Sequence, residues 1–204
     1  MTARTKLVLG AAGALVAGVA WQRVSPSACP YSQRWLLELP RPGLSPARLE
    51  RILEPVAGER LLEVGPGHGL FALAAAERIA PRGTLLAFDL QQEMLEALSR
   101  RAQRRGIGNI EPTQGDAAAL PYEDSSIDGA FLVTVLGEIP DQGAALGELR
   151  RVLRPGGRVV FGETVFDPHL VSLGALKRRA EAAGLHFEWT LGVPPLGFYA
   201  RFSA

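Results

Sequence analysis

From residue 59 onward, short apolar runs alternate with stretches that carry apolar residues at helical spacing. An apolar run of this kind is typical of a strand buried on both faces, and each intervening stretch is typical of an amphipathic helix. The alternation predicts an α/β fold in which helices cover both faces of a parallel sheet. The expected elements, in chain order, are strand 59–64, helix 69–79, strand 84–90, helix 91–105, strand 110–114, a strand within 126–136, a helix capped by Asp141, strand 158–166, helix 171–183 and strands 186–191 and 196–202.

The end of the chain departs from this alternation. Residues 192–195, which join the last two expected strands, are too few for a crossover helix. Parallel neighbours need such a crossover, whereas antiparallel neighbours can be joined by a short turn. At least one of the last two strands therefore runs antiparallel to the rest.

The first 24 residues have a different character. Residues 7–21 are an uncharged apolar stretch, preceded by Arg4 and Lys6. The stretch is shorter than the roughly 20 residues that a helix needs to cross a bilayer. A short or tilted membrane anchor, a secretory signal peptide and a helix packed on the protein itself all remain open. We divide the chain into a hydrophobic segment 1–24, a linker or cap 25–45 and an α/β domain 46–204.

Charge and cysteine content exclude several classes of function. Lysine and arginine number 22 against 21 aspartate and glutamate residues, for a formal net charge of +1. A dedicated nucleic-acid-binding protein usually has a strongly basic face, so we expect no nucleic-acid partner. Cys29 is the only cysteine. An intrachain disulfide and a cysteine-based zinc site are therefore impossible, and we expect no bound metal.

The main chemical signal is a glycine-rich loop between the first expected strand and helix, which reads EVGPGHG over residues 63–69. Glycines there let the backbone turn sharply and approach a ligand closely. Asp89, at the end of the second strand, follows Gly69 by 20 positions, where a carboxylate can accept both hydroxyls of a ribose. The GxGxG spacing differs from the GxGxxG dinucleotide fingerprint and disfavours a nicotinamide-dependent oxidoreductase. A tight turn without a ligand is the structural alternative.

Five segments in order match the motifs of one family: LLEVGPGHG, LLAFDL, GDA, SIDGAFLVTVLGEIPD and LRRVLRPGGRVVFGE. The chain resembles the class I S-adenosylmethionine-dependent methyltransferases, in particular the group that includes the ubiquinone and menaquinone biosynthesis enzymes. The resemblance covers roughly residues 45–204. It implies a Rossmann-like, doubly wound, mostly parallel seven-stranded sheet with an antiparallel last strand, to which residues 1–24 add an N-terminal hydrophobic helix.

The resemblance also implies S-adenosyl-L-methionine as the methyl donor. Asp89 is expected on the ribose and Asp116 on the adenine amino group. Glu63 suits a cationic cofactor, because it can organise the loop or meet the methionine ammonium through water. The full set of expected donor-binding residues is Glu63, Gly65, Pro66, Gly67, Gly69, Asp89, Leu90, Asp116, Ala117, Val133 and Thr134.

The sequence departs from the family in two places. Thr134 and Glu138 stand where many relatives carry an asparagine and a histidine. Only residues 165–172 separate the fifth strand from its helix, where relatives often insert a long lid. The acceptor pocket is therefore expected to be open or to be covered by the amino-terminal segment, in which Tyr31, Trp35, Leu36 and Leu39 are the apolar candidates.

Methyl transfer from a sulfonium is an in-line displacement, so the site mainly aligns the reactants and excludes water. No catalytic residue is assigned. Glu138 and Glu163 are the candidate proton acceptors, although both also fit structural roles, and His169 is more typical of a loop residue.

We expect methyl transfer to a small, apolar or lipid-like acceptor, on the cytoplasmic face of a membrane with which residues 7–21 associate. A non-catalytic cofactor-binding or interaction module is the alternative.

Overall fold

The computed structural model describes residues 30–32, 41 and 43–204. The expected N-terminal hydrophobic helix, the segment 1–24 and most of the linker lie outside the described residues. Within the described residues, no helix combines the length and the apolar character that crossing a bilayer requires.

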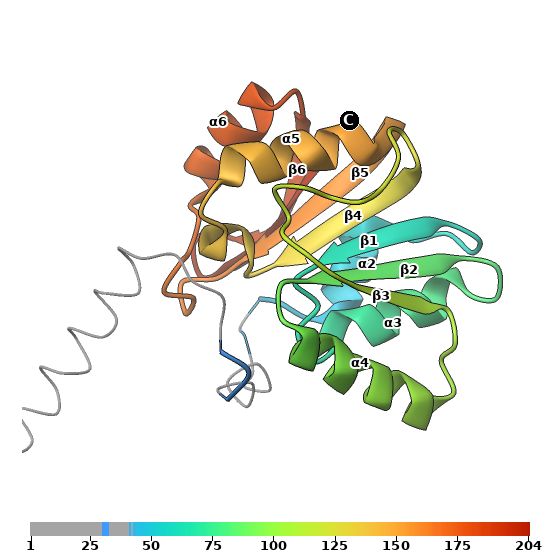
Figure 1. The fold of residues 1–204 in the computed structure, drawn as a ribbon. Coiled ribbons are helices and arrows are strands. Elements are labelled where there is room, and N and C mark those ends of the chain that lie inside the picture. The colour runs from blue at the N-terminus through green and yellow to red at the C-terminus, as the bar shows by residue number, and fades with distance from the viewer. Residues whose placement is uncertain (1–29, 33–40, 42) are drawn as a thin grey trace, which may run out of the picture.

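The described chain folds into one seven-stranded sheet with strand order β3-β2-β1-β4-β5-β7-β6 (Figure 1). Only β7 runs against the others, since it pairs antiparallel with both β5 and β6. The predicted doubly wound, mostly parallel sheet with a reversed last strand is therefore confirmed. The strands are β1 Arg60–Val64, β2 Thr84–Asp89, β3 Ile110–Gln114, β4 Ile127–Val133, β5 Leu153–Glu163, β6 His186–Val193 and β7 Gly197–Ser203.

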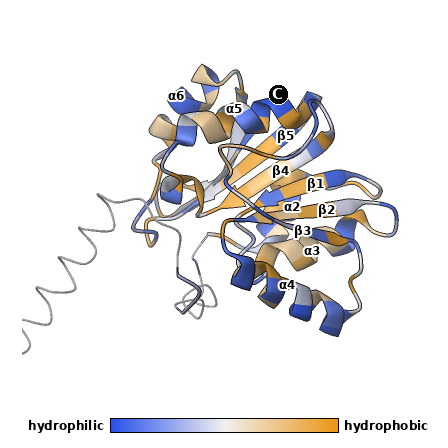
Figure 2. Cartoon of the chain, in the orientation of Figure 1, coloured by the Kyte–Doolittle hydropathy of each residue, from blue (hydrophilic) through white to orange (hydrophobic). Residues whose placement is uncertain are grey.

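Helices cover both faces of the sheet. They are α2 Pro46–Leu53, α3 Leu70–Ile79, α4 Gln92–Arg105, the 3-10 turn η2 Leu136–Glu138, α5 Gln142–Val152 and α6 Leu173–Ala182. Consecutive residues of a strand point to opposite faces, and the central strands are apolar on both: Phe131 packs into the core under α2, α3 and α4, while Leu132 packs into the core under α5 and α6. Figure 2 shows these apolar strands enclosed by helices whose outer faces are polar.

The fifth strand differs most from its predicted bounds of 158–166. It begins at Leu153, five residues earlier, so it includes Pro155 and Gly156, and its pairing with β4 shifts register between Ile127 and Gly129. It ends at Glu163 because the next residue turns toward the β6–β7 hairpin. The Thr164 hydroxyl donates a hydrogen bond of 2.8 Å to the Leu196 carbonyl.

Candidate cofactor and acceptor site

The glycine loop connects β1 to α3 in a backbone conformation that favours glycine. Gly65 has a φ of +71°, and a Cβ there would lie 2.4 Å from Cγ2 of Val135 in the loop after β4. Gly69 caps α3 with a φ of +94°, and a Cβ there would lie 2.3 Å from Cδ1 of Leu98 on α4. The loop after β4 and helix α4 thus leave no room for a side chain at Gly65 and Gly69 respectively, which explains why the sequence has glycine at both positions.

Asp89 ends β2 directly beside this loop. Its Oδ2 accepts a hydrogen bond of 3.3 Å from the Gly67 backbone N–H, and its Oδ1 accepts one of 2.9 Å from the Gln91 N–H. The side chain is largely buried, and burial raises the pKa of the carboxyl group above its ordinary value. The structure thus brings Asp89 and the glycine loop together, as the spacing predicted; the ribose contact stays a prediction.

Glu63 lies beneath the same loop on β1. It is 1% exposed, and its Oε2 accepts no hydrogen bond from the described residues. Burial and the nearby charge of Asp89 both raise the pKa of Glu63 well above the ordinary value for glutamate. A buried, unsatisfied carboxyl oxygen is costly, and a cation bound above it would lower that cost. The residues present therefore fit a cofactor that carries a sulfonium and an ammonium.

The other expected donor residues follow β3 and β4. Gly115 is tied to the end of β2 by its N–H, which donates to the Asp89 carbonyl at 3.0 Å. Asp116 is exposed, and its Oδ1 accepts from the Ala118 N–H at 2.9 Å. Thr134 follows β4 with a φ of +57°. The predicted donor-binding residues consequently lie along the carboxyl ends of β1 to β4, where ligands bind in open α/β sheets. The remaining members of the set are Pro66 and Val133, which are buried, Ala117, which is half-buried, and Leu90, which is exposed.

A second group of polar side chains lies after β5. Glu163 is 2% exposed, and its Oε2 accepts a hydrogen bond of 3.1 Å from the Val171 N–H. Burial, together with the charges of Asp167 and Glu138, raises the pKa of Glu163 to about 8. Asp167 accepts from the His169 N–H at 2.7 Å. The structure therefore gathers the sequence candidates Glu138, Glu163 and His169 into one cluster, and Glu163 holds the short β5–α6 loop.

Sequence reasoning missed two members of this region. The Asp167 side chain is 9% exposed. Burial raises its pKa, while the hydrogen bond from the His169 N–H and the charges of His169 and Arg41 oppose the rise. Arg41, in the linker, donates a hydrogen bond of 3.2 Å from Nη1 to the Thr134 hydroxyl. Neither residue falls in a motif. Arg41 and Thr134 are 93 positions apart in the sequence, so no local sequence pattern predicts their contact. Asp167 could have been suspected from its place in the short loop after β5.

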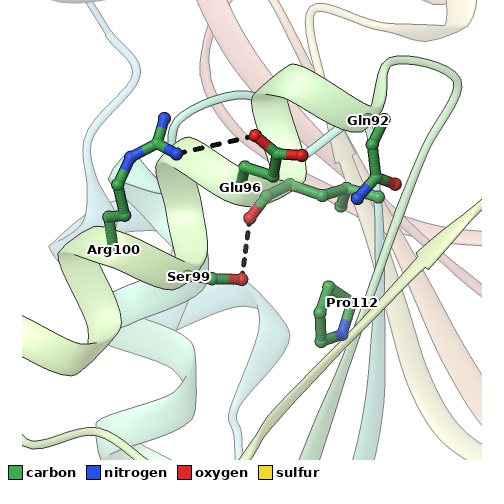
Figure 3. A pocket seen from close by; sticks show the side chains of 6 residues that line it. Gln92, Glu96, Ser99, Arg100 and Pro112 are labelled. Atoms are coloured by element: carbon green, nitrogen blue, oxygen red, sulfur yellow. Dashed lines mark hydrogen bonds and ion pairs between the residues drawn. The ribbon is translucent and has the colours of Figure 1, made fainter.

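A hollow on the flank of α4, beside β3, lies outside this site and contains none of the predicted site residues (Figure 3). It is lined by Gln92, Leu95, Glu96, Ser99, Arg100 and Pro112. Among the described residues, no three histidine, cysteine, aspartate or glutamate side chains are grouped so that they could hold a metal ion.

Comparison with known proteins agrees with this arrangement. A family described as "Methyltransferase domain" matches residues 62–161. A demethylmenaquinone methyltransferase from Geobacillus kaustophilus is 36% identical over 107 residues, which are 52% of this chain and 46% of that protein. Nocamycin O-methyltransferase from Saccharothrix syringae is 33% identical over 123 residues, which are 60% of this chain and 44% of that protein. The alignments thus span less than half the length of these relatives.

Solved structures give the same fold. The crystal structure of a SAM dependent methyltransferase from Aquifex aeolicus superimposes with a TM-score of 0.78 over 86% of this chain and 99% of that chain. The two sequences are 20% identical. At that identity the likeness concerns the architecture alone.

Proposed function

The chain belongs to the class I S-adenosylmethionine-dependent methyltransferases, and on that premise we propose that it transfers a methyl group from S-adenosylmethionine to a small, apolar or lipid-like acceptor. When bound, the donor supplies an activated methyl group on its sulfonium. The residues of this chain bind and orient the two reactants and keep water out. The relatives bear names that differ in their acceptors, so the acceptor is argued from the site itself.

The observation that carries the proposal is the unsatisfied Oε2 of Glu63, 1% exposed beside the Asp89 carboxylate and beneath the glycine loop. Two buried carboxyl groups repel each other, and each is costly to charge. A ligand that places a cation near Glu63 and a ribose diol on Asp89 removes both penalties. S-adenosylmethionine carries both: a ribose diol and, on the substituent of the ribose 5′ carbon, a sulfonium followed by an ammonium, without a pyrophosphate between them.

Support for an apolar acceptor comes from the surface around the site. Eight large apolar side chains are exposed among the described residues. Six of them lie at the carboxyl edge of the sheet, which is also the edge of the site: Leu70, Leu90, Val165, Phe166, Val193 and Leu196. An edge of this composition favours an acceptor that is itself apolar.

Binding of the donor product tests the first half of the proposal. Replacement of Asp89 by alanine removes an ionised acceptor for two ribose hydroxyls. Because hydrogen bonds to charged groups contribute about 1.5–3 kcal/mol, we expect S-adenosylhomocysteine to bind about tenfold to a hundredfold more weakly. Calorimetric titration of the full chain measures this affinity. Asp124→Ala, which changes an exposed aspartate away from the site, is the matched control. Equal affinity of Asp89→Ala and the parent protein, or tighter binding of NAD than of S-adenosylhomocysteine, contradicts the proposal.

The alternative is a module that binds the cofactor without transferring its methyl group. Thr134 and Glu138, which replace the family's usual asparagine and histidine, favour this alternative. Incubation of the full chain with methyl-labelled S-adenosylmethionine and a total lipid extract distinguishes the two. Label in a chloroform-soluble product supports the enzyme, whereas binding without transfer to lipid or to small polar acceptors supports the module.

A proton must leave an acceptor that is methylated on a hydroxyl, thiol or acidic carbon. Glu163 and Glu138 are our candidates to receive it, because both lie in the carboxyl cluster beside the carboxyl ends of β4 and β5. A pKa of about 8 makes Glu163 predominantly protonated at neutral pH, which disfavours it as a base in the unliganded protein. If Glu163 receives the proton, Glu163→Gln lowers kcat and abolishes the rise of kcat with pH.

The proposed place of action is the cytoplasmic face of a membrane, because the donor is made inside cells and residues 7–21 are apolar. Removal of residues 1–24 from the full chain is expected to reduce membrane association and to leave S-adenosylhomocysteine binding unchanged. A mature amino terminus that begins after residue 20, found by mass spectrometry, contradicts this placement.

A further inference from the structure

Four exposed apolar side chains gather on two loops that contact each other. Val165 and Phe166, in the β5–α6 loop, are 40% and 66% exposed, while Val193 and Leu196, at the tip of the β6–β7 hairpin, are 62% and 57% exposed. The Val165 N–H donates to the Pro195 carbonyl at 2.8 Å. We call Val165, Phe166, Val193 and Leu196 the apolar rim.

The rim is held outward by ordered backbone. The buried Thr164 donates its hydroxyl proton to the Leu196 carbonyl, and Val193 pairs with Gly197 at the end of the hairpin ladder. A side chain on a loop that is fixed in this way cannot turn inward without breaking those hydrogen bonds. Residues 190–200 and 164–166 contain no charged side chain. Large apolar side chains that are held exposed to solvent on loops without charged residues indicate a site of contact with another apolar phase, which is a protein surface or a lipid bilayer.

The chain itself indicates which phase this is. Gly43, near the end of the linker, packs against the hairpin, because a Cβ there would lie 2.7 Å from the carbonyl oxygen of Gly197, the residue after Leu196. Nearer to the uncharged apolar stretch of residues 7–21, the Tyr31 N–H donates to Oε1 of Gln91 at 3.1 Å, just before α4. The described linker residues on both sides are therefore held at the carboxyl edge of the sheet. The β5–α6 loop and the hairpin tip also lie at the same edge of the sheet as the glycine loop and Asp89.

We infer that the apolar rim inserts into a lipid bilayer and turns the carboxyl edge of the sheet toward it. The charged side chain that follows the rim in sequence, Asp167, is only 9% exposed. Exposed apolar side chains of this kind partition into the boundary between headgroups and acyl chains, as the apolar faces of interfacial helices do. In that orientation the acceptor reaches the site from the membrane. This route rests on the proposed function, and it narrows the class of acceptor to molecules dissolved in the bilayer. The docking itself does not depend on catalysis.

The test places a fluorescent reporter on the rim of the full chain. Cys29→Ser removes the native thiol, and Phe166→Cys and Leu196→Cys each then carry an environment-sensitive nitrobenzoxadiazole label. Val56→Cys is the matched control, because Val56 is 60% exposed but lies in the α2–β1 loop at the opposite edge of the sheet. Each protein is mixed with vesicles of phosphatidylcholine and phosphatidylglycerol.

We expect a blue shift and a rise in emission at positions 166 and 196 when vesicles are added, and no change at position 56. Unchanged emission at all three positions overturns the inference, even if the protein sediments with the vesicles, because residues 7–21 would then bind without the rim. A shift that appears without vesicles and grows with protein concentration assigns the rim to a second copy of the chain and also overturns it. Titration of each labelled protein with S-adenosylhomocysteine separates a failure of docking from a failure of the proposed function.

Discussion

Buried carboxyl groups dominate the chemistry of this site at the scale of single residues. Glu63, Asp89 and Glu163 are all less than 10% exposed, and burial raises the pKa of each. Such groups are kept because a ligand or a local hydrogen bond uses them, since an apolar residue of the same size would cost less. Asp89 accepts two backbone N–H groups and Glu163 accepts one, whereas Oε2 of Glu63 accepts none from the described residues.

The pH dependence of stability distinguishes the charge of Glu163 from its hydrogen bond. The pKa is about 8 in the folded chain against an ordinary 4.5. An acid whose folded pKa is raised binds more protons when folded, so its contribution destabilises progressively as the pH rises from about 4.5 to 8. Glu163→Gln keeps an oxygen for the Val171 N–H but cannot ionise. We expect it to raise the free energy of unfolding by about 1–4 kcal/mol at pH 8.5 and by much less at pH 5.

Urea denaturation at the two pH values measures this difference. Glu123→Gln, at an exposed position in the loop before β4, controls for the general effect of removing one negative charge. A loss of stability in Glu163→Gln at both pH values shows that the ionised carboxylate is needed to hold the β5–α6 loop, which contradicts the expectation.

At the scale of elements, the sequence predicts what depends on local pattern. The spacing of apolar residues and the glycine and proline positions between them predicted most strands and helices to within a few residues. The short connection 192–195 predicted the antiparallel β7. The limits of β5 were missed because they depend on its partners: β4 extends the ladder back to Leu153, and the hairpin draws Thr164 away after Glu163. Asp89 could be predicted from motif spacing, whereas Arg41 could not, since its contact with Thr134 is purely tertiary.

The packing of η2 against the β5–α6 loop gives a prediction at this scale. A Cβ on Gly137 would lie 1.8 Å from the backbone carbonyl oxygen of His169, so the loop must move to accommodate alanine. Gly147, within α5, has open space at the same position. We expect Gly137→Ala to lower the free energy of unfolding by about 1–3 kcal/mol. Gly147→Ala is expected to raise it by up to about 1 kcal/mol, because alanine is the better helix former.

Thermal and denaturant unfolding of both variants provide the measurement, and S-adenosylhomocysteine titration reports on the neighbouring site. Displacement of the loop also moves Asp167 and His169, so Gly137→Ala is expected to lower methyl transfer more than donor binding. Equal stability of the two alanine variants means that η2 and the loop do not pack as described.

At the scale of the whole molecule, one arginine joins elements that are distant in sequence. Arg158 on β5 donates from Nη1 and Nη2 to both carboxylate oxygens of Glu59, at 2.8 and 2.6 Å, and from Nη2 to the Glu54 carbonyl at 3.1 Å. Its Nε also donates to the Leu53 carbonyl at the end of α2. The guanidinium therefore fixes the end of α2 to β5 and to the loop before β1.

Removal of Arg158 tests whether this cluster holds α2 on the sheet. The Arg158 and Glu59 side chains are 12% and 17% exposed. Arg158→Ala leaves the Glu59 carboxylate with only the Val56 N–H as a donor and removes the arginine donor from the carbonyls of Leu53, Glu54 and Asp128. We expect a loss of about 2–4 kcal/mol in the free energy of unfolding at pH 7. Arg78→Ala breaks a comparable pair with Glu50, but that arginine is 62% exposed and solvent screens the interaction, so no measurable loss is expected.

The pH dependence of the Arg158→Ala effect identifies its cause. Burial is the largest single influence and raises the pKa of Glu59, but the hydrogen bonds from Arg158 and from the Val56 N–H, together with the Arg158 charge, outweigh it, so the net pKa is lowered below 4.5. A carboxyl group whose pKa is lowered by folding stabilises the folded chain when the pH is above the pKa of the unfolded state. This stability is lost as the pH falls through the pKa of the folded state. The difference between the parent protein and Arg158→Ala should therefore shrink in urea titrations below pH 4.5. A difference that stays constant down to pH 3 would mean that Arg158 acts through the Leu53 and Glu54 carbonyls and not through Glu59, and Glu59→Gln would then be as stable as the parent protein.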